Sequence, residues 1–359
     1  MQVMAKNNAQ WLNAAAAEAF QLGTHVFIKT NLRPPKASVL PVPGHSMREW
    51  DPRGQLAKKT WNKIIQDALS KIEYQCFKNA VVLTVVRSPF PRFDPINMNP
   101  EFALEAMMNY ELLADISPGR TLYTTIGHRD IQGGTDFYIG PPDFVPKMMQ
   151  IIAKILGDSW TAEKMGMDYF LTAQPREIIS PQRIPPREWP ISRALAQVSG
   201  KFPEASFSIE KTHIVFKTNI HPPQVGILVP QGFLPFPLYV SWVKEARGIW
   251  IDLLEKHHKT IALQTIKKSV VLIVFRTQNF HFHPINYDIK AIMNALVDLR
   301  IIEDDASDTL AFFTAAQRCS MNGGIDIYVG TPEFLQEITK IMAPILRWNP
   351  YIFHQNQRA

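Results

Sequence analysis

The chain has 359 residues, 46% of them hydrophobic and 19% charged, and its formal net charge is +6 at pH 7. This composition is that of a globular protein and excludes a largely disordered one, and the length allows two domains that each bury a core. The longest apolar run, Val270–Phe275, has the length of a strand, which excludes a membrane-spanning helix. Cys76 and Cys319 are the only cysteines, too few for a disulfide framework, so we expect a cytoplasmic protein without a signal peptide.

The first half of the chain predicts a leading helix and then strands alternating with helices. Residues 1–21 contain an alanine run and are expected to form an N-terminal helix, which Gly23 would close. The β-branched segment Thr24–Asn31 predicts a strand that leads into a Pro-rich turn. A helix over Lys58–Ile72 and a second apolar strand over Val81–Arg87 follow.

The second half predicts the same elements in the same order. These are a strand over Thr212–Asn219, a helix over Val243–His257, strands over Val270–Arg276, Leu310–Ala316 and Ile325–Val329, and a short helix over Ile289–Leu299. A Gly-Gly pair is expected to turn a hairpin between the last two strands. The final helix is expected to start at Pro332, with Thr331 as its N-cap.

The two halves also share sequence blocks at a spacing of roughly 190 residues, which is too long for a solenoid and indicates domain duplication. Pro95-Ile96-Asn97 returns as Pro284-Ile285-Asn286, and Gly133-Gly134-x-Asp136-x-Tyr138-x-Gly140 returns as Gly323-Gly324-x-Asp326-x-Tyr328-x-Gly330. The expected fold class is therefore α+β, with two tandem copies of a mixed-sheet domain that carries its helices on one side.

The expected organisation has five parts. They are an N-terminal helix (1–21), repeat 1 (22–157), a Pro-rich ordered linker (158–209), repeat 2 (210–347) and a C-terminal tail (348–359). The linker is rich in prolines, which rule out a long regular element, and its aromatic residues could anchor it across the two repeats.

One segment of repeat 2 carries a family resemblance. It reads His283-Pro284-Ile285-Asn286-Tyr287-Asp288-Ile289-Lys290, continues through Asn294-Ala295-Leu296, and ends Ile301-Ile302-Glu303-Asp304-Asp305. This spacing resembles the core of the RusA family of Holliday-junction resolvases, found mostly in phages and prophages, which has the form D-x-D-N-x-x-K, then D-A-L, then an apolar pair ending in D-D. Because that family acts as symmetric dimers, the resemblance implies that the two repeats form an intramolecular pseudo-dimer, in the host cytoplasm if a phage encodes the chain.

The resemblance also implies a magnesium-dependent nuclease site, and the sequence departs from it. The family's first two metal aspartates fall on Pro284 and Asn286, its lysine on Lys290, and its essential aspartate on Asp305. Proline offers no ligand, and an amide offers only a neutral oxygen, so little of a magnesium cage remains. If the chain is an enzyme, the expected site residues are Asp305, Asp304, Asp288, Asn286 and Lys290, with Asp305 as the metal ligand. In repeat 1 the lysine position is Glu101 and the D-D pair is Asp115-Ile116.

Several of these residues have simpler interpretations. Asp304 and Asp305 could form a solvated turn before a strand, Asn286 could cap the next segment, and Lys290 could be an ordinary surface lysine. His281 and His283 lie on one strand face and could bind a transition metal with Asp305, or could simply be exposed.

Binding to nucleic acid would not need the lost carboxylates, because phosphate contacts use lysines, arginines and backbone amides. The candidates recur at matching places in the two repeats or lie in the linker. They are Lys29, Lys58, Lys59, Lys63, Arg87, Arg129, Arg183, Arg187, Lys217, Lys244, Arg247, Lys267, Lys268, Arg276, Lys290 and Arg318.

The leading hypothesis is therefore a non-catalytic protein that binds branched or single-stranded DNA in phage replication, recombination or transcription. It would need no cofactor, would act as a monomer with an internal pseudo-two-fold axis, and could contact a protein of that machinery. The first alternative is a structure-specific endonuclease that uses magnesium or manganese at a divergent site in repeat 2. The second is a protein-interaction scaffold, for which the Pro-rich linker would be suited.

Overall fold

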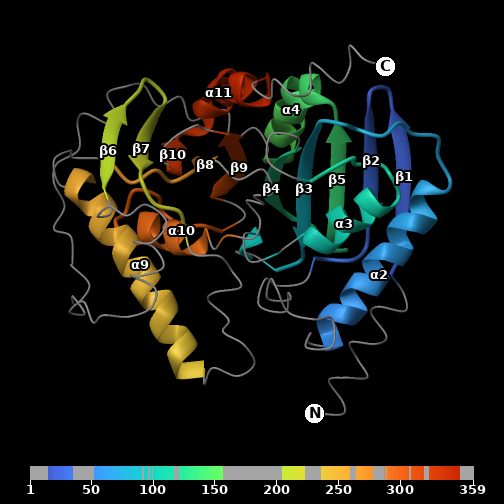
Figure 1. Ribbon diagram of the computed structural model, residues 1–359, viewed down its shortest axis with the longest axis horizontal. Coiled ribbons are helices and arrows are strands. Elements are labelled where there is room, and N and C mark those ends of the chain that lie inside the picture. Colours follow the sequence, from blue (N-terminus) through green and yellow to red (C-terminus); the bar gives the residue numbers. More distant parts are fainter. Residues whose placement is uncertain are drawn as a thin grey trace.

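The computed structural model describes residues 15–34, 52–90, 93–95, 98, 100–116, 121–156, 204–222, 236–258, 264–277, 287, 289–306, 309–318 and 323–347. These residues form a mixed α+β structure in which all ten strands belong to one sheet (Figure 1). Repeat 1 contributes β1 (Ala17–Leu22), β2 (His25–Thr30), β3 (Ala80–Ser88), β4 (Thr121–Arg129) and β5 (Gly134–Gly140). Repeat 2 contributes β6 (Ala205–Ile209), β7 (His213–Thr218), β8 (Ser269–Thr277), β9 (Leu310–Arg318) and β10 (Gly324–Gly330).

The sheet has the order β1-β2-β5-β3-β4-β9-β8-β10-β7-β6, so its two halves have the same internal strand order, read outward from the centre. Within each half one pair is parallel, β3 with β4 and β8 with β9, and the other pairs are antiparallel. The halves meet at an antiparallel pairing of β4 with β9 that runs from Tyr123 opposite Thr314 to Ile126 opposite Ala311. A continuous hydrogen-bonded sheet therefore joins the two repeats.

Six α-helices lie in the described part of the chain. They are α2 (Pro52–Leu69), α3 (Glu101–Asn109), α4 (Val145–Leu156), α9 (Phe236–His258), α10 (Lys290–Asp298) and α11 (Leu335–Arg347). Short 3-10 turns, Pro142–Phe144 and Pro332–Phe334, lead into α4 and α11. Thr331 precedes the second turn as expected, but its hydroxyl makes no capping hydrogen bond there.

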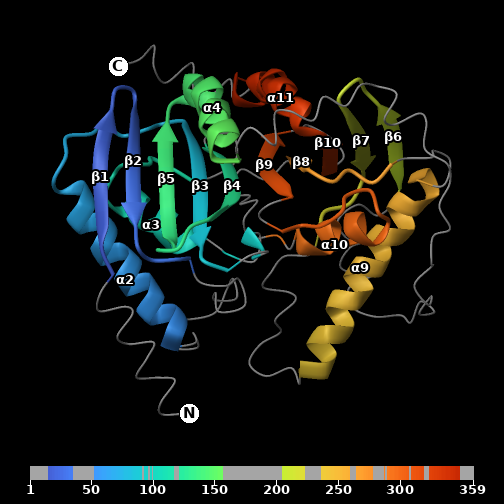
Figure 2. The same cartoon turned by 180° about the vertical axis from the view of Figure 1, so that it is seen from behind.

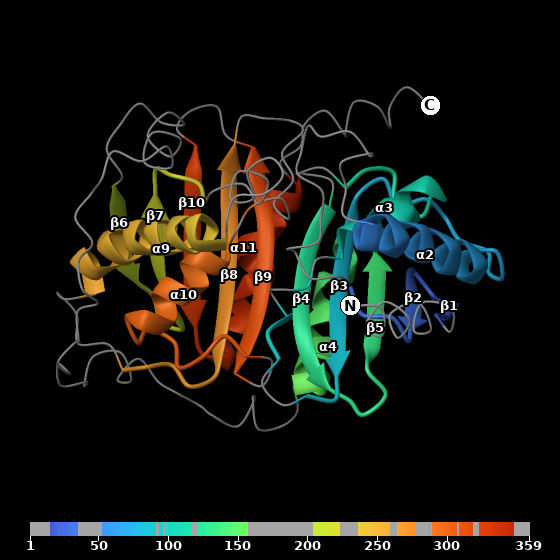
Figure 3. The ribbon, with the colours of Figure 1, turned by 90° about the horizontal axis from the view of Figure 1, so that it is seen from below.

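Helices cover both faces of the sheet, which corrects the prediction that they lie on one side. On one face α2 and α3 enclose a core that includes Trp61 and Phe102, and α9 and α10 enclose a matching core around Trp250. On the other face α4 and α11 contact each other and share one core with the central strands of both repeats (Figures 1 and 2). Figure 3 shows the first set of helices in front of the sheet and α4 and α11 behind it. Successive side chains of the central strands point to opposite faces of the sheet, and these strands are apolar on both faces. Helices can therefore cover both faces.

Two strands replace other predictions. Ala17–Leu22 was expected to end the N-terminal helix, but it forms β1, which pairs with β2 through a two-residue turn where Gly23 has φ 64°. Ala205–Ile209 was expected in the linker, but it forms β6 and pairs with β7 in the same way. Pairing with a neighbouring strand overrides the helix propensity of an alanine-rich segment.

Among the described residues, no helix has the length and hydrophobicity that crossing a membrane requires.

Candidate functional site

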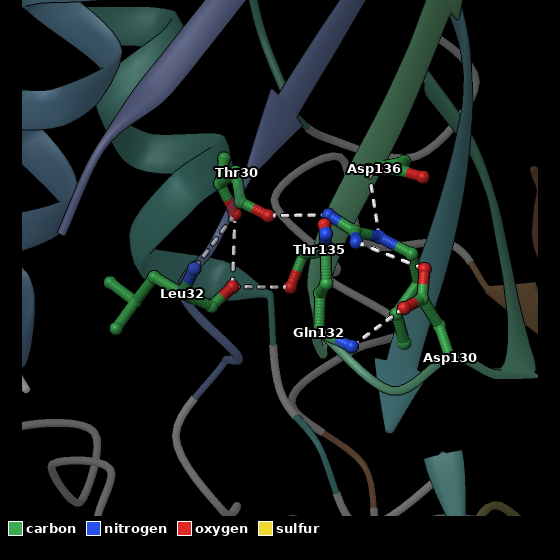
Figure 4. Close-up of polar contacts among 7 residues, drawn as sticks. Thr30, Leu32, Asp130, Gln132, Thr135 and Asp136 are labelled. Atoms are coloured by element: carbon green, nitrogen blue, oxygen red, sulfur yellow. Dashed lines mark hydrogen bonds and ion pairs between the residues drawn. The ribbon is translucent and has the colours of Figure 1, made fainter. Parts of the chain in front are cut away.

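The Gly-Gly turns do not form the predicted hairpins, because β3 lies between β4 and β5, and β8 lies between β9 and β10. An arginine of the intervening strand lies opposite the second glycine of each turn, Arg87 in repeat 1 and Arg276 in repeat 2. In repeat 1 the Arg87 side chain donates to the Asp136 carboxylate at 3.1 Å, to the Asp130 carboxylate at 3.2 Å and to the Thr30 carbonyl at 2.7 Å (Figure 4). Burial raises the pKa of Asp136 even though Arg87 and Lys29 oppose the shift. Burial also acts to raise the pKa of Asp130, but the Gln132 N–H and Arg87 outweigh it, so the pKa of Asp130 is lowered.

Repeat 2 has two of these three contacts, made by equivalent residues. Arg276 Nε lies 3.1 Å from the Asp326 carboxylate, and its Nη2 donates to the Thr218 carbonyl at 2.6 Å. A close approach of the backbone explains why a glycine stands two residues before each aspartate. Gly324 has φ 140°, and a Cβ placed there would lie 2.0 Å from the Thr218 carbonyl oxygen, so no larger residue fits.

These contacts change the interpretation of two candidate phosphate-binding residues. Arg87 is 4% exposed and surrounded by three acceptors, so it has no free donor at the surface to offer a phosphate. The Arg276 side chain is 26% exposed, but it too is held by an aspartate and a carbonyl. The recurrence of this arginine therefore reflects its structural contacts beside the Gly-Gly turn.

The second polar cluster joins the two repeats. The Lys290 ammonium, at the start of α10, donates to the carboxylates of both Asp94 and Asp305. Asp94 follows β3 of repeat 1, whereas Asp305 precedes β9 of repeat 2, and the β4–β9 pairing brings these two regions together. We refer to Asp94, Lys290 and Asp305 as the junction cluster.

The two carboxylates of the junction cluster keep the lysine charged. Burial alone would lower the pKa of Lys290, but Asp94 and Asp305 outweigh it, so the pKa is raised above its ordinary value and the ammonium stays charged. The side chains are between 14% and 25% exposed, where such pairs are stronger than on the open surface. The lysine ammonium lies between the two carboxylates, at the position that a cation bound by both of them would take.

The remaining predicted site residues are only partly placed. Asp304 accepts a hydrogen bond from the backbone N–H of Asp305 at 2.8 Å, so it shapes the turn before β9. The interpretation of the pair as a solvated turn, and of Lys290 as an ordinary surface lysine, is wrong, because all three residues are half-buried and Asp305 pairs with Lys290. Asn286 and Asp288, and the histidine pair His281 and His283, lie outside the described residues. Within the described part of the chain, no group of three or more His, Cys, Asp and Glu side chains could hold a metal.

Asp94 is the junction residue that the sequence prediction missed. It immediately precedes the repeated Pro-Ile-Asn block, where repeat 2 has His283. The signal was present in that adjacency, because a carboxylate beside a block shared by both repeats is a natural candidate. The two repeats carry different residues at this position, however, so it does not stand out when the repeats are compared.

The position equivalent to Lys290 in repeat 1 is a carboxylic acid. Glu101 begins α3, and burial, together with Glu105, raises its pKa to about 7, although Lys58 opposes the shift. Glu101 and Asp115 also contribute to the raised pKa of the buried Tyr123, after the larger effect of its burial, which places both carboxylates near this ring. The first residue of α10 is therefore a charged lysine, whereas the first residue of α3 is a carboxylic acid that burial favours in its protonated form.

The other basic candidates fall into three groups. Lys29, Lys59, Lys63, Arg129, Lys217 and Lys267 are exposed, and Lys268 is half-buried. Lys58 forms a 2.7 Å ion pair with Glu105, and Arg247 forms a two-pronged pair with Asp298, so these two connect α2 to α3 and α9 to α10. Arg183 and Arg187 lie outside the described residues, and nothing is described of the side chains of Lys244 and Arg318.

No family model matches the chain, and no curated protein matches it either.

Proposed function

We propose that the chain is a non-catalytic nucleic-acid-binding protein, made of two RusA-like repeats that form a pseudo-dimer within one polypeptide. The observation that carries this proposal is the junction cluster. Two carboxylates converge from the two repeats, and Lys290 of the same chain forms an ion pair with both. This lysine would compete with a metal ion for the carboxylates on which metal-assisted hydrolysis depends, whereas phosphate binding by basic side chains does not need them.

The architecture supports the pseudo-dimer. The two halves have the same strand order, pair edge to edge through β4 and β9, and share one apolar core beneath α4 and α11. This is the arrangement expected when two identical subunits with an isologous interface become fused and then diverge.

Binding is supported by the charge that remains accessible. The net charge is +6, and several exposed basic residues occur at matching strands or turns, such as Lys29 with Lys217 and Lys78 with Lys267. Phosphates of a nucleic acid are bound by such side chains without any requirement for sequence readout.

A salt titration tests the proposal. Fluorescence anisotropy with a labelled four-way junction, a duplex and a single strand should show binding at low salt that weakens steeply as salt rises. Replacing Lys59 and Lys63 of α2 with Gln should reduce the salt slope by about two. Lys340→Gln is the matched control, because this lysine is 74% exposed but paired with Glu337 on α11. The absence of binding at low salt would favour a protein-interaction scaffold instead.

A cleavage assay tests the non-catalytic part. The four-way junction is incubated with the full chain and either magnesium or manganese, and the expected result is intact DNA. Cleavage that disappears in Asp305→Asn would overturn the proposal and support the divergent endonuclease.

A further inference from the structure

The outer strands of repeat 1 carry a row of aromatic side chains on the sheet face that α4 and α11 cover only near the centre. Phe20 of β1, Phe27 of β2 and Tyr138 of β5 are direct cross-strand neighbours. The Phe20 and Phe27 rings stack at 6.0 Å between centroids with 21° between planes, and Phe27 stacks on Tyr138 at 4.6 Å with 28°. We call these three side chains the aromatic row.

The row ends at an open edge. β1 is the outermost strand of the sheet, so in the described part of the chain no further strand lies on the side of Phe20 that faces away from Phe27. Phe20 is 43% exposed, a large fraction for an aromatic ring. An aromatic ligand that stacked on Phe20 would extend the row by one ring.

Basic residues lie on both sides of the row. Lys29, one pleat along β2 from Phe27, is exposed, with Glu18 and Asp136 as its cross-strand neighbours. Asp136 is balanced by Arg87. On the other side, the exposed Lys147 of α4 lies close enough to His25 to lower the pKa of that histidine, after the larger effect of burial. A negatively charged backbone could therefore run beside the rings on either side.

Repeat 2 lacks the row at the same sheet positions. There the cross-strand neighbours are Ser208, Val215 and Tyr328, although the lysine in the next register position is kept as Lys217. The scaffold of the repeat therefore does not need the aromatic row, which indicates that repeat 1 keeps it for another purpose. Rings beside lysines are the combination with which proteins bind unpaired bases.

We propose that the aromatic row binds single-stranded nucleic acid, with an unpaired base stacked on Phe20 and a phosphate next to Lys29. This inference rests on the proposed nucleic-acid binding and specifies the strand form and the repeat that contacts it. Duplex DNA cannot use this surface in the same way, because its bases are already stacked on one another.

The test compares substitutions on one strand. The full chain is titrated into a labelled 20-nucleotide oligo-dT and into a hairpin duplex, with anisotropy as the readout. Phe20→Ser introduces the residue that repeat 2 has at this position and should weaken single-strand binding by about tenfold without changing duplex binding. Phe20→Trp should keep or strengthen single-strand binding, which also guards against a folding defect in Phe20→Ser.

Leu22→Ser is the matched control, because Leu22 is 45% exposed on the same strand and face but has no ring. It should leave single-strand affinity unchanged. An equal loss in both variants, or no loss in Phe20→Ser, would overturn the stacking inference while duplex binding would still support the proposed function. A change of oligomeric state in Phe20→Ser, measured by light scattering, would likewise overturn it and assign the row to contact between proteins. Failure of every nucleic acid to bind would instead refute the proposed function.

Discussion

Arg87 satisfies three acceptors from inside the sheet, and this makes it a structural residue at a position where sequence alone suggested a phosphate contact. Arg87→Ala would leave Asp136 and its neighbours buried without their counter-charge. We expect the free energy of unfolding to fall by about 3–5 kcal/mol, measured by urea denaturation. Arg276→Ala should cost less, because its side chain is 26% exposed. Normal stability combined with lost DNA binding in Arg87→Ala would contradict this assignment.

Glu101 gives repeat 1 a pH dependence. Its pKa rises from 4.5 to about 7 on folding, so the folded state binds a proton more tightly than the unfolded state. The stability that this proton contributes is present at low pH and is lost as the pH rises from about 4.5 through 7. Glu101→Gln should therefore raise the free energy of unfolding at pH 8 by up to about 3 kcal/mol, seen as a higher melting temperature. At pH 4.5 the melting temperature should be nearly unchanged. An equal effect at both pH values would refute this origin.

Some residue contacts could be predicted and others could not. The pairing of Arg87 with Asp136 was open to prediction, because an arginine and a Gly-Gly-x-Asp block recur together in both repeats. The pairing of Asp94 with Lys290 was not, because it joins different repeats and neither residue is matched in the other copy. Residues that recur in both repeats indicate contacts within each repeat. A contact between the repeats depends instead on how β4 and β9 pair, which the recurring residues do not indicate.

At the scale of elements, the apolar pattern predicted the buried strands and the first helix of each repeat, although α2 and α9 begin six and seven residues before the predicted starts, Lys58 and Val243. The continuous apolar runs of β3 and β8 are typical of strands buried on both faces. The same apolar runs also imply that helices cover both faces of these strands, whereas the predicted fold placed the helices on one side. β1 could not be recognised from its own composition, since its strand form depends on pairing with β2.

The second glycine of each Gly-Gly turn lies where a side chain would collide with the neighbouring backbone. A Cβ at Gly134 would lie 2.2 Å from the Thr30 carbonyl oxygen, and φ there is 120°. Gly134→Ala should therefore lower the free energy of unfolding by about 3 kcal/mol, measured by thermal denaturation. Gly248→Ala in α9 is the control, because nothing lies within 4 Å of its added methyl group, and it should stabilise the helix by about 1 kcal/mol. Equal effects of the two substitutions would contradict the strain.

At the scale of the whole molecule, the two repeats are joined in three different ways. The sheet is continuous through β4 and β9, α4 and α11 share a core with both sets of central strands, and Lys290 holds a carboxylate from each side. An interface of this kind resembles a domain core and not a transient contact between domains. The duplicated halves should therefore behave as one folding unit.

Separating the repeats tests that conclusion. A fragment of residues 1–157 would expose the β4 edge and its half of the core beneath α4, and a fragment of residues 204–347 would expose β9 and the core beneath α11. Each fragment alone should self-associate or aggregate, because an unpaired apolar strand edge recruits another strand. Mixing the two should restore a 1:1 complex, measured by size-exclusion chromatography with light scattering. The control is the full chain cut at a protease site inserted between residues 158 and 203, whose halves should elute together. Two folded, monomeric fragments with no affinity for each other would show that the shared core does not hold the molecule together.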